Sequence, residues 1–229
     1  MRDVREQAFQ ANRAIVEAGL VVLTFGNASA VDREAGVMAI KPSGVAYEEL
    51  SAAAMVVVDL ESGEVVEGDH RPSSDTPTHL VLYRAFDSIG GIAHTHSEYA
   101  TAWAQAAREL PCFGTTHADH FHGAVPVTRA LTREEIDGDY EHATGEVIVE
   151  TLVGVDPLAM PAVLVAGHAP FTWGADAAHA VENAVALEVV AASALRTELL
   201  RPGAAPIDDA LLDRHFLRKH GPGAYYGQR

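Results

Sequence analysis

The chain has 229 residues, of which 48% are hydrophobic and 21% are charged, a composition typical of globular proteins with a buried core. Its 16 lysines and arginines against 32 aspartates and glutamates give a formal net charge of −16, which argues against nucleic acid or an acidic membrane surface as a partner. The single cysteine, Cys112, excludes an intramolecular disulfide and fits a reducing cytoplasm. No stretch reaches the ~20 uninterrupted apolar residues of a membrane span.

Hydrophobic spacing and turn residues predict the secondary structure in chain order. In the first half we expect a helix over 3–18, strands over 20–25, 37–40, 55–59 and 65–66, a short helix over 47–53, a loop over 26–29 and a helix over 76–86. In the second half we expect strands over 89–96, 124–127 and 162–168, helices over 99–108, 132–136, 145–153, 177–200 and 208–219, and a polar loop over 115–120. Strands and helices alternate without a repeat or a long linker. The sequence therefore predicts one α/β domain, residues 1–229, with a helix-flanked mixed sheet.

Two histidines follow an apolar run in the segment His94-Thr95-His96. On an extended strand alternate side chains point to the same face, so both imidazoles would project together. Zinc needs at least one further protein ligand, and His168 follows a second apolar run in the same way. A pair of histidines satisfied by hydrogen bonds at a strand end is the alternative interpretation.

Three polar loops separate buried segments and contain small residues beside hydroxyl or amide groups. They are Gly26-Asn27, Ser43-Gly44 and Ser73-Ser74. Backbone N–H and side-chain O–H donors of this kind hold phosphate or sugar hydroxyls, and Lys41 would add positive charge. For any one loop alone, ordinary turn chemistry explains the residues equally well.

Two aspartates are candidates for chemistry. Asp119 lies in the polar loop between His117 and His120, where it could act as a general acid or base or be a solvated carboxylate. Asp75 could be a helix cap, a fourth metal ligand or both. The residues alone therefore indicate a zinc-dependent enzyme that acts on a small polar substrate.

Longer motifs in a fixed order then reveal a family resemblance. Its carriers are the stretches 24–29, 40–44, 72–79, 91–97 and 114–119, Lys219-His220-Gly221, and Tyr225-Tyr226-Gly227-Gln228. Over essentially its whole length the chain resembles the L-ribulose-5-phosphate 4-epimerases of the class II aldolase/epimerase superfamily. The resemblance implies a three-layer domain with a largely antiparallel central sheet.

The resemblance also implies roles for the candidate residues. One zinc ion per subunit would be bound by His94, His96 and His168, with Asp75 as a further ligand or close neighbour. Substrate would contact Gly26, Asn27, Lys41, Ser43, Gly44, Ser73 and Ser74. Asp119 and Tyr226 would be the acid/base residues, and His215 a further active-site histidine. The tail, about 208–229, would complete the active site of a neighbouring subunit in a homotetramer.

The implied reaction inverts carbon 4 of L-ribulose 5-phosphate by breaking and re-forming the C3–C4 bond, in the catabolism of pentoses such as L-arabinose and with no nucleotide cofactor. Relatives in ascorbate or xylulose pathways use the same substrate. An aldolase of the fuculose-phosphate type is the alternative activity, although such aldolases carry glutamate where this chain has Asp75. A non-catalytic scaffold like the adducin head domain is expected to lack the ligand histidines, which are all present here.

Overall fold

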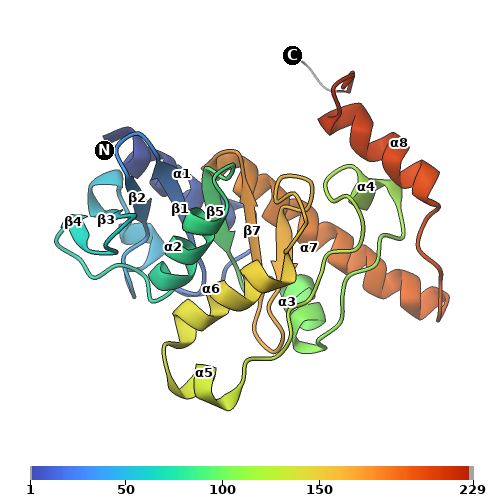
Figure 1. Cartoon of the computed structure of the whole chain (residues 1–229), viewed down its shortest axis with the longest axis horizontal. Coiled ribbons are helices and arrows are strands. Elements are labelled where there is room, and N and C mark those ends of the chain that lie inside the picture. Colours follow the sequence, from blue (N-terminus) through green and yellow to red (C-terminus); the bar gives the residue numbers. More distant parts are fainter. Residues whose placement is uncertain (1, 227–229) are drawn as a thin grey trace.

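The computed structural model describes residues 2–226, and Met1 and residues 227–229 of the expected tail lie outside the described residues (Figure 1). Its helices are α1 (Arg2–Glu17), α2 (Thr76–Ala85), α3 (Glu98–Gln105), α4 (Thr115–Ala118), α5 (Arg133–Asp137), α6 (Tyr140–Thr151), α7 (Ala177–Leu200) and α8 (Asp209–His220), with 3-10 turns η1 (Tyr47–Glu49) and η2 (Ala52–Ala54). Its strands are β1 (Asn27–Asp32), β2 (Val37–Ile40), β3 (Val56–Asp59), β4 (Val65–Glu67), β5 (Gly91–His94), β6 (Ala162–Leu164) and β7 (Pro170–Gly174).

The strands form one seven-stranded sheet in the order β4-β3-β2-β1-β5-β7-β6. Each neighbouring pair of these strands is antiparallel. The expected mixed sheet is therefore antiparallel throughout its named strands, and a parallel pairing occurs in the isolated bridge Val127–Leu164. Short turns, such as the one between β1 and β2, bring consecutive strands back beside each other without a crossover.

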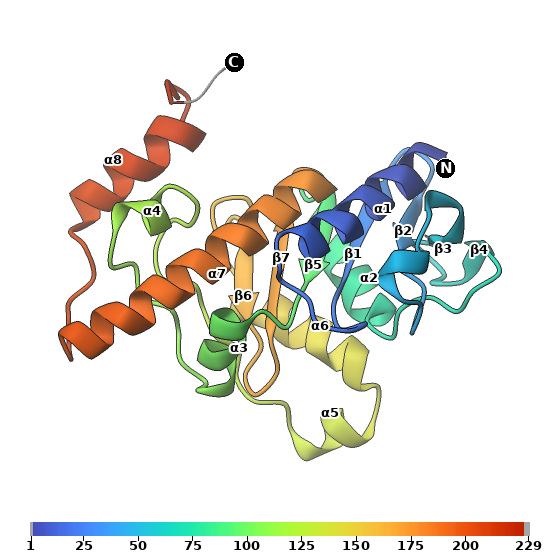
Figure 2. The ribbon, with the colours of Figure 1, turned by 180° about the vertical axis from the view of Figure 1, so that it is seen from behind.

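Both faces of the sheet are covered, which makes the three layers expected for the family. Along β3, Val56 and Val58 enter the core beneath α2 and α6, whereas Val57 enters the core beneath α1 and the first half of α7. This alternation follows from the two-residue period of a strand. Figure 2 shows α1 and α7 in front of the sheet, on the side opposite α2 and α6.

The α7 helix is the one helix of residues 2–226 that is long and apolar enough to cross a membrane by length and composition, with half of the tested window buried. Its buried residues, among them Ala180, Leu187 and Ala191, pack into the two cores. This packing agrees with the expected buried helix.

Several local predictions are wrong. The expected strand over 20–25 is a turn in which Leu23 is exposed and has φ of +56°, and the strand begins instead at Asn27 within the expected loop. The polar loop over 115–120 contains the helical turn α4, and β7 was missed. A run of apolar residues without clear alternation does not show where a strand begins or ends. In these segments the strand boundaries depend on packing against neighbouring parts of the chain.

Candidate active site

The candidate metal centre begins where β5 ends. The strand stops at His94 rather than His96, yet the two imidazoles still converge, with 3.2 Å between their Nε2 atoms. His94 is buried: its Nδ1–H donates to the carbonyl of Pro170 at 2.9 Å, and its ring stacks on Phe171 with centroids 4.1 Å apart. Because Nδ1 carries the proton, the lone pair of His94 lies on Nε2.

His168 completes the histidine cluster from the turn between β6 and β7. Each of His94, His96 and His168 offers a nitrogen, and these atoms lie within 4.8 Å of one another. Burial, aided by the neighbouring histidines, lowers the pKa of His168 to about 4 and also lowers the pKa of His96. Both rings are therefore neutral at pH 7, the form in which imidazole binds metal.

The donor set fits zinc by geometry and chemistry. Two nitrogens at the corners of a tetrahedron with ~2.05 Å bonds are about 3.3 Å apart, and the Nε2 atoms of His94 and His96 are 3.2 Å apart. The Nδ1 atom of His168 is buried and has no hydrogen-bond partner within residues 2–226. Three imidazoles converging from rigid elements are a donor set for a divalent cation such as zinc.

Asp75 lies beside the three histidines as the residue before α2. Its Oδ2 atom is 4.0 Å from Nε2 of His94 and accepts a 2.6 Å hydrogen bond from Nδ2 of Asn27. Burial pushes the pKa of Asp75 up, but the neighbouring histidines and the Asn27 bond outweigh it, so the net pKa is lowered. Its side chain makes no cap hydrogen bond to α2. An anionic carboxylate is therefore held next to the histidines rather than serving the helix.

A cavity of about 440 Å³ joins the histidines to all three predicted polar loops. Its lining includes every residue predicted to bind substrate or metal, together with five that were missed, Thr24, Phe25, Pro42, Tyr140 and Glu141. Backbone hydrogen bonds tie two of the loops together, from Ser43 N–H to the Arg71 carbonyl and from Ser73 N–H to the Lys41 carbonyl, both 2.9 Å. The loops thus form one polar wall beside the candidate metal centre.

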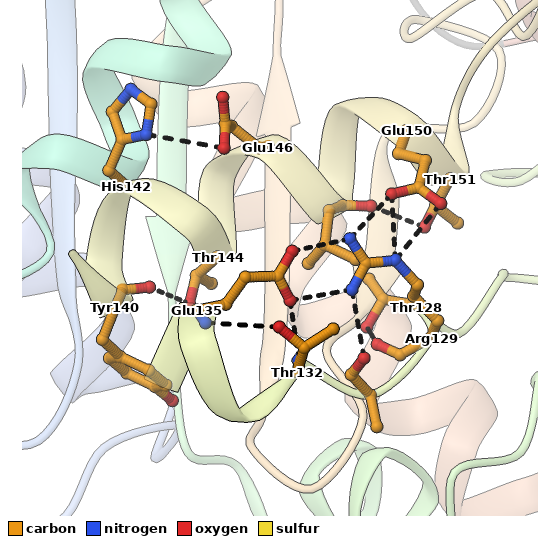
Figure 3. Close-up of polar contacts among 12 residues, drawn as sticks. Thr128, Arg129, Thr132, Glu135, Tyr140, His142, Thr144, Glu146, Glu150 and Thr151 are labelled. Carbon is orange, nitrogen blue, oxygen red and sulfur yellow. Dashed lines mark hydrogen bonds and ion pairs between the residues drawn. The ribbon is translucent and has the colours of Figure 1, made fainter. Parts of the chain in front are cut away.

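Tyr140 and Glu141 reach this cavity from the first turn of α6, and nothing in their sequence context distinguishes them from surface residues. Thr78 of α2 donates a 2.6 Å hydrogen bond to the Glu141 carbonyl, which fixes the start of α6 against the start of α2. Figure 3 shows the outer side of α6, where Arg129 binds both Glu135 of α5 and Glu150 of α6. The candidate site therefore includes one wall that only the tertiary structure reveals.

Asp119 lies outside the lining of this cavity. It follows α4 and accepts hydrogen bonds from Arg218 and from Nδ1 of His215, at 2.8 and 3.1 Å. Burial raises the pKa of Asp119, but the Arg218 and His215 bonds and the nearby Lys219 outweigh it, so the carboxyl stays ionised. In Figures 1 and 2, α4 and α8 lie at the opposite end of the molecule from the starts of α2 and α6.

Tyr226 belongs to this second group. Its ring packs against Arg218, with the guanidinium carbon 4.5 Å from the ring centroid, and the residue is 56% exposed. The structure thus brings together the predicted metal and substrate residues in one cavity. It brings together Asp119, His215 and Tyr226 around Arg218 in another place, outside the cavity lining.

Comparisons with known proteins agree with this architecture. Residues 6–195 match the family model of the Class II Aldolase and Adducin N-terminal domain. The chain is 56% identical over 229 residues, the full length of both, to proteins named L-ribulose-5-phosphate 4-epimerase UlaF from Salmonella paratyphi A and Salmonella typhi.

Among solved structures, an L-fuculose 1-phosphate aldolase is 28% identical, with a TM-score of 0.76 over 91% of this chain and 92% of that one. An L-fuculose-1-phosphate aldolase from Thermus thermophilus, 23% identical, shares the fold with a TM-score of 0.68 over 89% of this chain and all of that one. The chain therefore belongs to the class II aldolase and adducin family.

Proposed function

We propose that this protein is an L-ribulose-5-phosphate 4-epimerase, an isomerase that interconverts L-ribulose 5-phosphate and D-xylulose 5-phosphate. The observation that carries the proposal is the single cavity in which His94, His96 and His168 adjoin the three polar loops. Relatives that are 56% identical over the whole chain have this activity as their name.

In the proposed holoenzyme one zinc ion per subunit is held by His94, His96 and His168, with Asp75 as a fourth ligand or as a neighbour of the ion. The ion supplies Lewis-acid stabilisation of negative charge on the carbonyl and adjoining hydroxyl oxygens of the substrate. Asn27 keeps the Asp75 carboxylate in place through its 2.6 Å hydrogen bond. The buried His94–Pro170 bond fixes the ligand ring in the same way.

The polar loops are proposed to bind the phosphate and hydroxyl groups of the substrate. Ser43, Ser73 and Ser74 supply hydroxyl donors, and Gly44 and Ser74 supply backbone N–H donors. Lys41 supplies charge, and Gly26 and Asn27 contact the sugar. This arrangement is supported by the loops lining one cavity with the histidines. A phosphate anchored there would leave the sugar carbons directed toward the metal centre.

The reaction is proposed to proceed by cleavage and re-formation of a carbon–carbon bond. Carbon 4 is not adjacent to the carbonyl, so direct deprotonation there would produce no stabilised carbanion. A base instead removes the proton of the C4 hydroxyl, the C3–C4 bond breaks, and its electrons pass to the three-carbon fragment as the enediolate of dihydroxyacetone. The other fragment is glycolaldehyde phosphate, because the phosphate is on carbon 5; it turns over and is attacked on its other face.

Two acid/base groups on opposite faces of the aldehyde are needed, and Asp119 and Tyr226 are the proposed pair, with His215 beside them. None of these three residues lines the cavity, and α4 and α8 lie at the opposite end of the molecule from the starts of α2 and α6 (Figure 1). We therefore propose that they act on the cavity of a neighbouring subunit. A homotetramer with active sites at its subunit interfaces would provide that arrangement. In this proposal the chain is a single domain over 1–229, and its tail from about 208 completes the active site of a neighbouring subunit.

The second candidate function is that of a class II aldolase, which releases its fragments. The structural similarity to an L-fuculose 1-phosphate aldolase favours it. Asp75, instead of a glutamate, stands against it. We further propose that the enzyme acts in the cytoplasm on free sugar phosphate in pentose catabolism, and that it requires no nucleotide.

The test is to supply zinc-loaded protein with L-ribulose 5-phosphate and follow D-xylulose 5-phosphate, free glycolaldehyde phosphate and dihydroxyacetone together. Formation of D-xylulose 5-phosphate with little free fragment is expected. Accumulation of both fragments would instead assign aldolase activity, and the absence of both reactions would refute the proposed substrate.

A further inference from the structure

Tyr47, on the 3-10 turn η1, connects two of the polar loops from behind. Its hydroxyl donates a 2.8 Å hydrogen bond to the carbonyl of Gly26. Its ring lies beside the ammonium of Lys41, with Nζ 4.8 Å from the ring centroid. Tyr47 is absent from the lining of the 440 Å³ cavity, so it supports the wall without facing the cavity.

Lys41 depends on this support because its charge is buried. The residue is 2% exposed, and no carboxylate pairs with its ammonium among residues 2–226. The ammonium donates to the carbonyls of Val45 and Pro42, at 2.8 and 3.3 Å, which leaves one of its three N–H donors for another partner. Burial lowers the pKa of Lys41, and the electron-rich face of Tyr47 opposes that effect by attracting the cation.

The hydrogen bond from the Tyr47 hydroxyl to the Gly26 carbonyl anchors the second loop, Gly26-Asn27. Gly26 precedes Asn27, whose side chain holds Asp75, and the planar peptide between Gly26 and Asn27 turns as one unit. Anchoring the Gly26 carbonyl to Tyr47 therefore fixes the peptide from which Asn27 projects. Tyr47 thus contacts the cationic side chain of one loop and the backbone of the other.

We propose that Tyr47 is a positioning residue for binding of the phosphate-bearing substrate, holding Lys41 and the Gly26–Asn27 peptide in a fixed relation across the cavity wall. The inference rests on the proposed function, because it takes these loops to bind phosphate. It adds a residue outside the cavity that determines substrate affinity through two others.

Tyr99 offers a matched control. It is also a partly buried tyrosine beside a cation: Arg196 donates to its hydroxyl at 3.2 Å, and the guanidinium carbon is 5.1 Å from its ring centroid. Tyr99 is outside the lining of the cavity. Tyr47→Phe and Tyr99→Phe therefore remove the same chemical group, once behind the loops and once elsewhere.

The experiment measures Kd for inorganic phosphate and KM and kcat for L-ribulose 5-phosphate in the zinc-loaded parent, Tyr47→Phe, Tyr47→Leu and Tyr99→Phe. Loss of the hydroxyl bond should raise both Kd and KM by about 3- to 10-fold in Tyr47→Phe, since one net hydrogen bond is at stake. Tyr47→Leu, which also removes the aromatic face, should raise them further. In both variants KM should rise by a larger factor than kcat falls, and Tyr99→Phe should match the parent.

Zinc content and thermal unfolding of each variant establish that the comparison concerns folded holoenzyme. If Tyr47→Phe and Tyr47→Leu both bind phosphate and substrate like the parent, the positioning role is refuted while the proposed function stands. The role is equally refuted if Tyr99→Phe weakens binding as much as Tyr47→Phe. If the parent itself binds neither ligand, the phosphate assignment of the loops fails, and the role of Tyr47 fails with it.

Discussion

Replacement of Gly26 by alanine tests whether the metal centre and the polar loops are mechanically joined. Gly26 has φ of +84°, and an added Cβ would lie 2.7 Å from the carbonyl oxygen of His94. That oxygen belongs to the last residue of β5, so relief of the contact must move either the backbone that leads from His94 to His96 or the Gly26 loop that faces it. Gly36 is the matched control, since its φ is +68° but an added Cβ meets nothing within 4 Å.

The magnitudes follow from these two environments. Alanine in the left-handed region costs about 1 kcal/mol, which is the whole expected effect at Gly36. At Gly26 the backbone contact adds about 1–3 kcal/mol. For 229 residues the entropy of unfolding is about 0.5 kcal/mol/K. We therefore expect Tm to fall by about 2 °C in Gly36→Ala and by about 4–8 °C in Gly26→Ala.

The assay is thermal unfolding of both variants with and without added zinc, together with zinc content and epimerase activity. Gly26→Ala should lose zinc affinity and activity, whereas Gly36→Ala should keep both. Equal loss of Tm in the two variants, or a Gly26→Ala protein with parental zinc affinity, would refute the view that the Gly26 contact sets the position of the predicted metal ligands.

Three further outcomes are expected. His96→Ala should lose bound zinc and activity together, measured by metal analysis and turnover; full activity without metal would contradict the Lewis-acid role. Tyr226→Phe should fold and assemble like the parent but epimerise poorly, and parental turnover would show that the tail assignment is wrong. Burial lowers the pKa of His79 to about 3 and of His117 to about 4, so the unfolded state binds protons first as pH falls. Unfolding free energy in urea should therefore be highest above pH ~6.5 and fall from pH ~6.5 to ~4; a flat profile would contradict buried neutral rings.

The sequence predicted the chemical groups of the site more accurately than the boundaries of the strands. His94, His96 and His168 could be predicted because imidazoles after apolar runs are a chemical pattern visible in one dimension, and the structure brings them together. The strand expected over 20–25 was wrong because Val22, Leu23 and Phe25 remain exposed, and only packing against other segments decides burial. Local pattern and tertiary context disagree most at such edges.

Other parts of the site could not be predicted because they depend on distant contacts. Tyr140 reaches the cavity from the start of α6, which a hydrogen bond from Thr78 of α2 holds in place, and the two residues are far apart in sequence. Tyr47 likewise acquires its contacts with Gly26 and Lys41 from the way β1, β2 and η1 pack. The location of Asp119 at the other end of the molecule is also a result of packing, through its bonds to α8.

The distance between Asp119 and the cavity has a genetic consequence under the proposed assembly. A subunit without His96 would still donate an intact Asp119–Tyr226 group, and a subunit without Tyr226 would still offer an intact metal pocket. Two alleles that are each inactive could therefore restore part of each other's activity when both chains are produced in one cell. Selection would then act on the mixed assembly, because a defect at one end of the fold would be complemented by a chain whose defect lies at the other end.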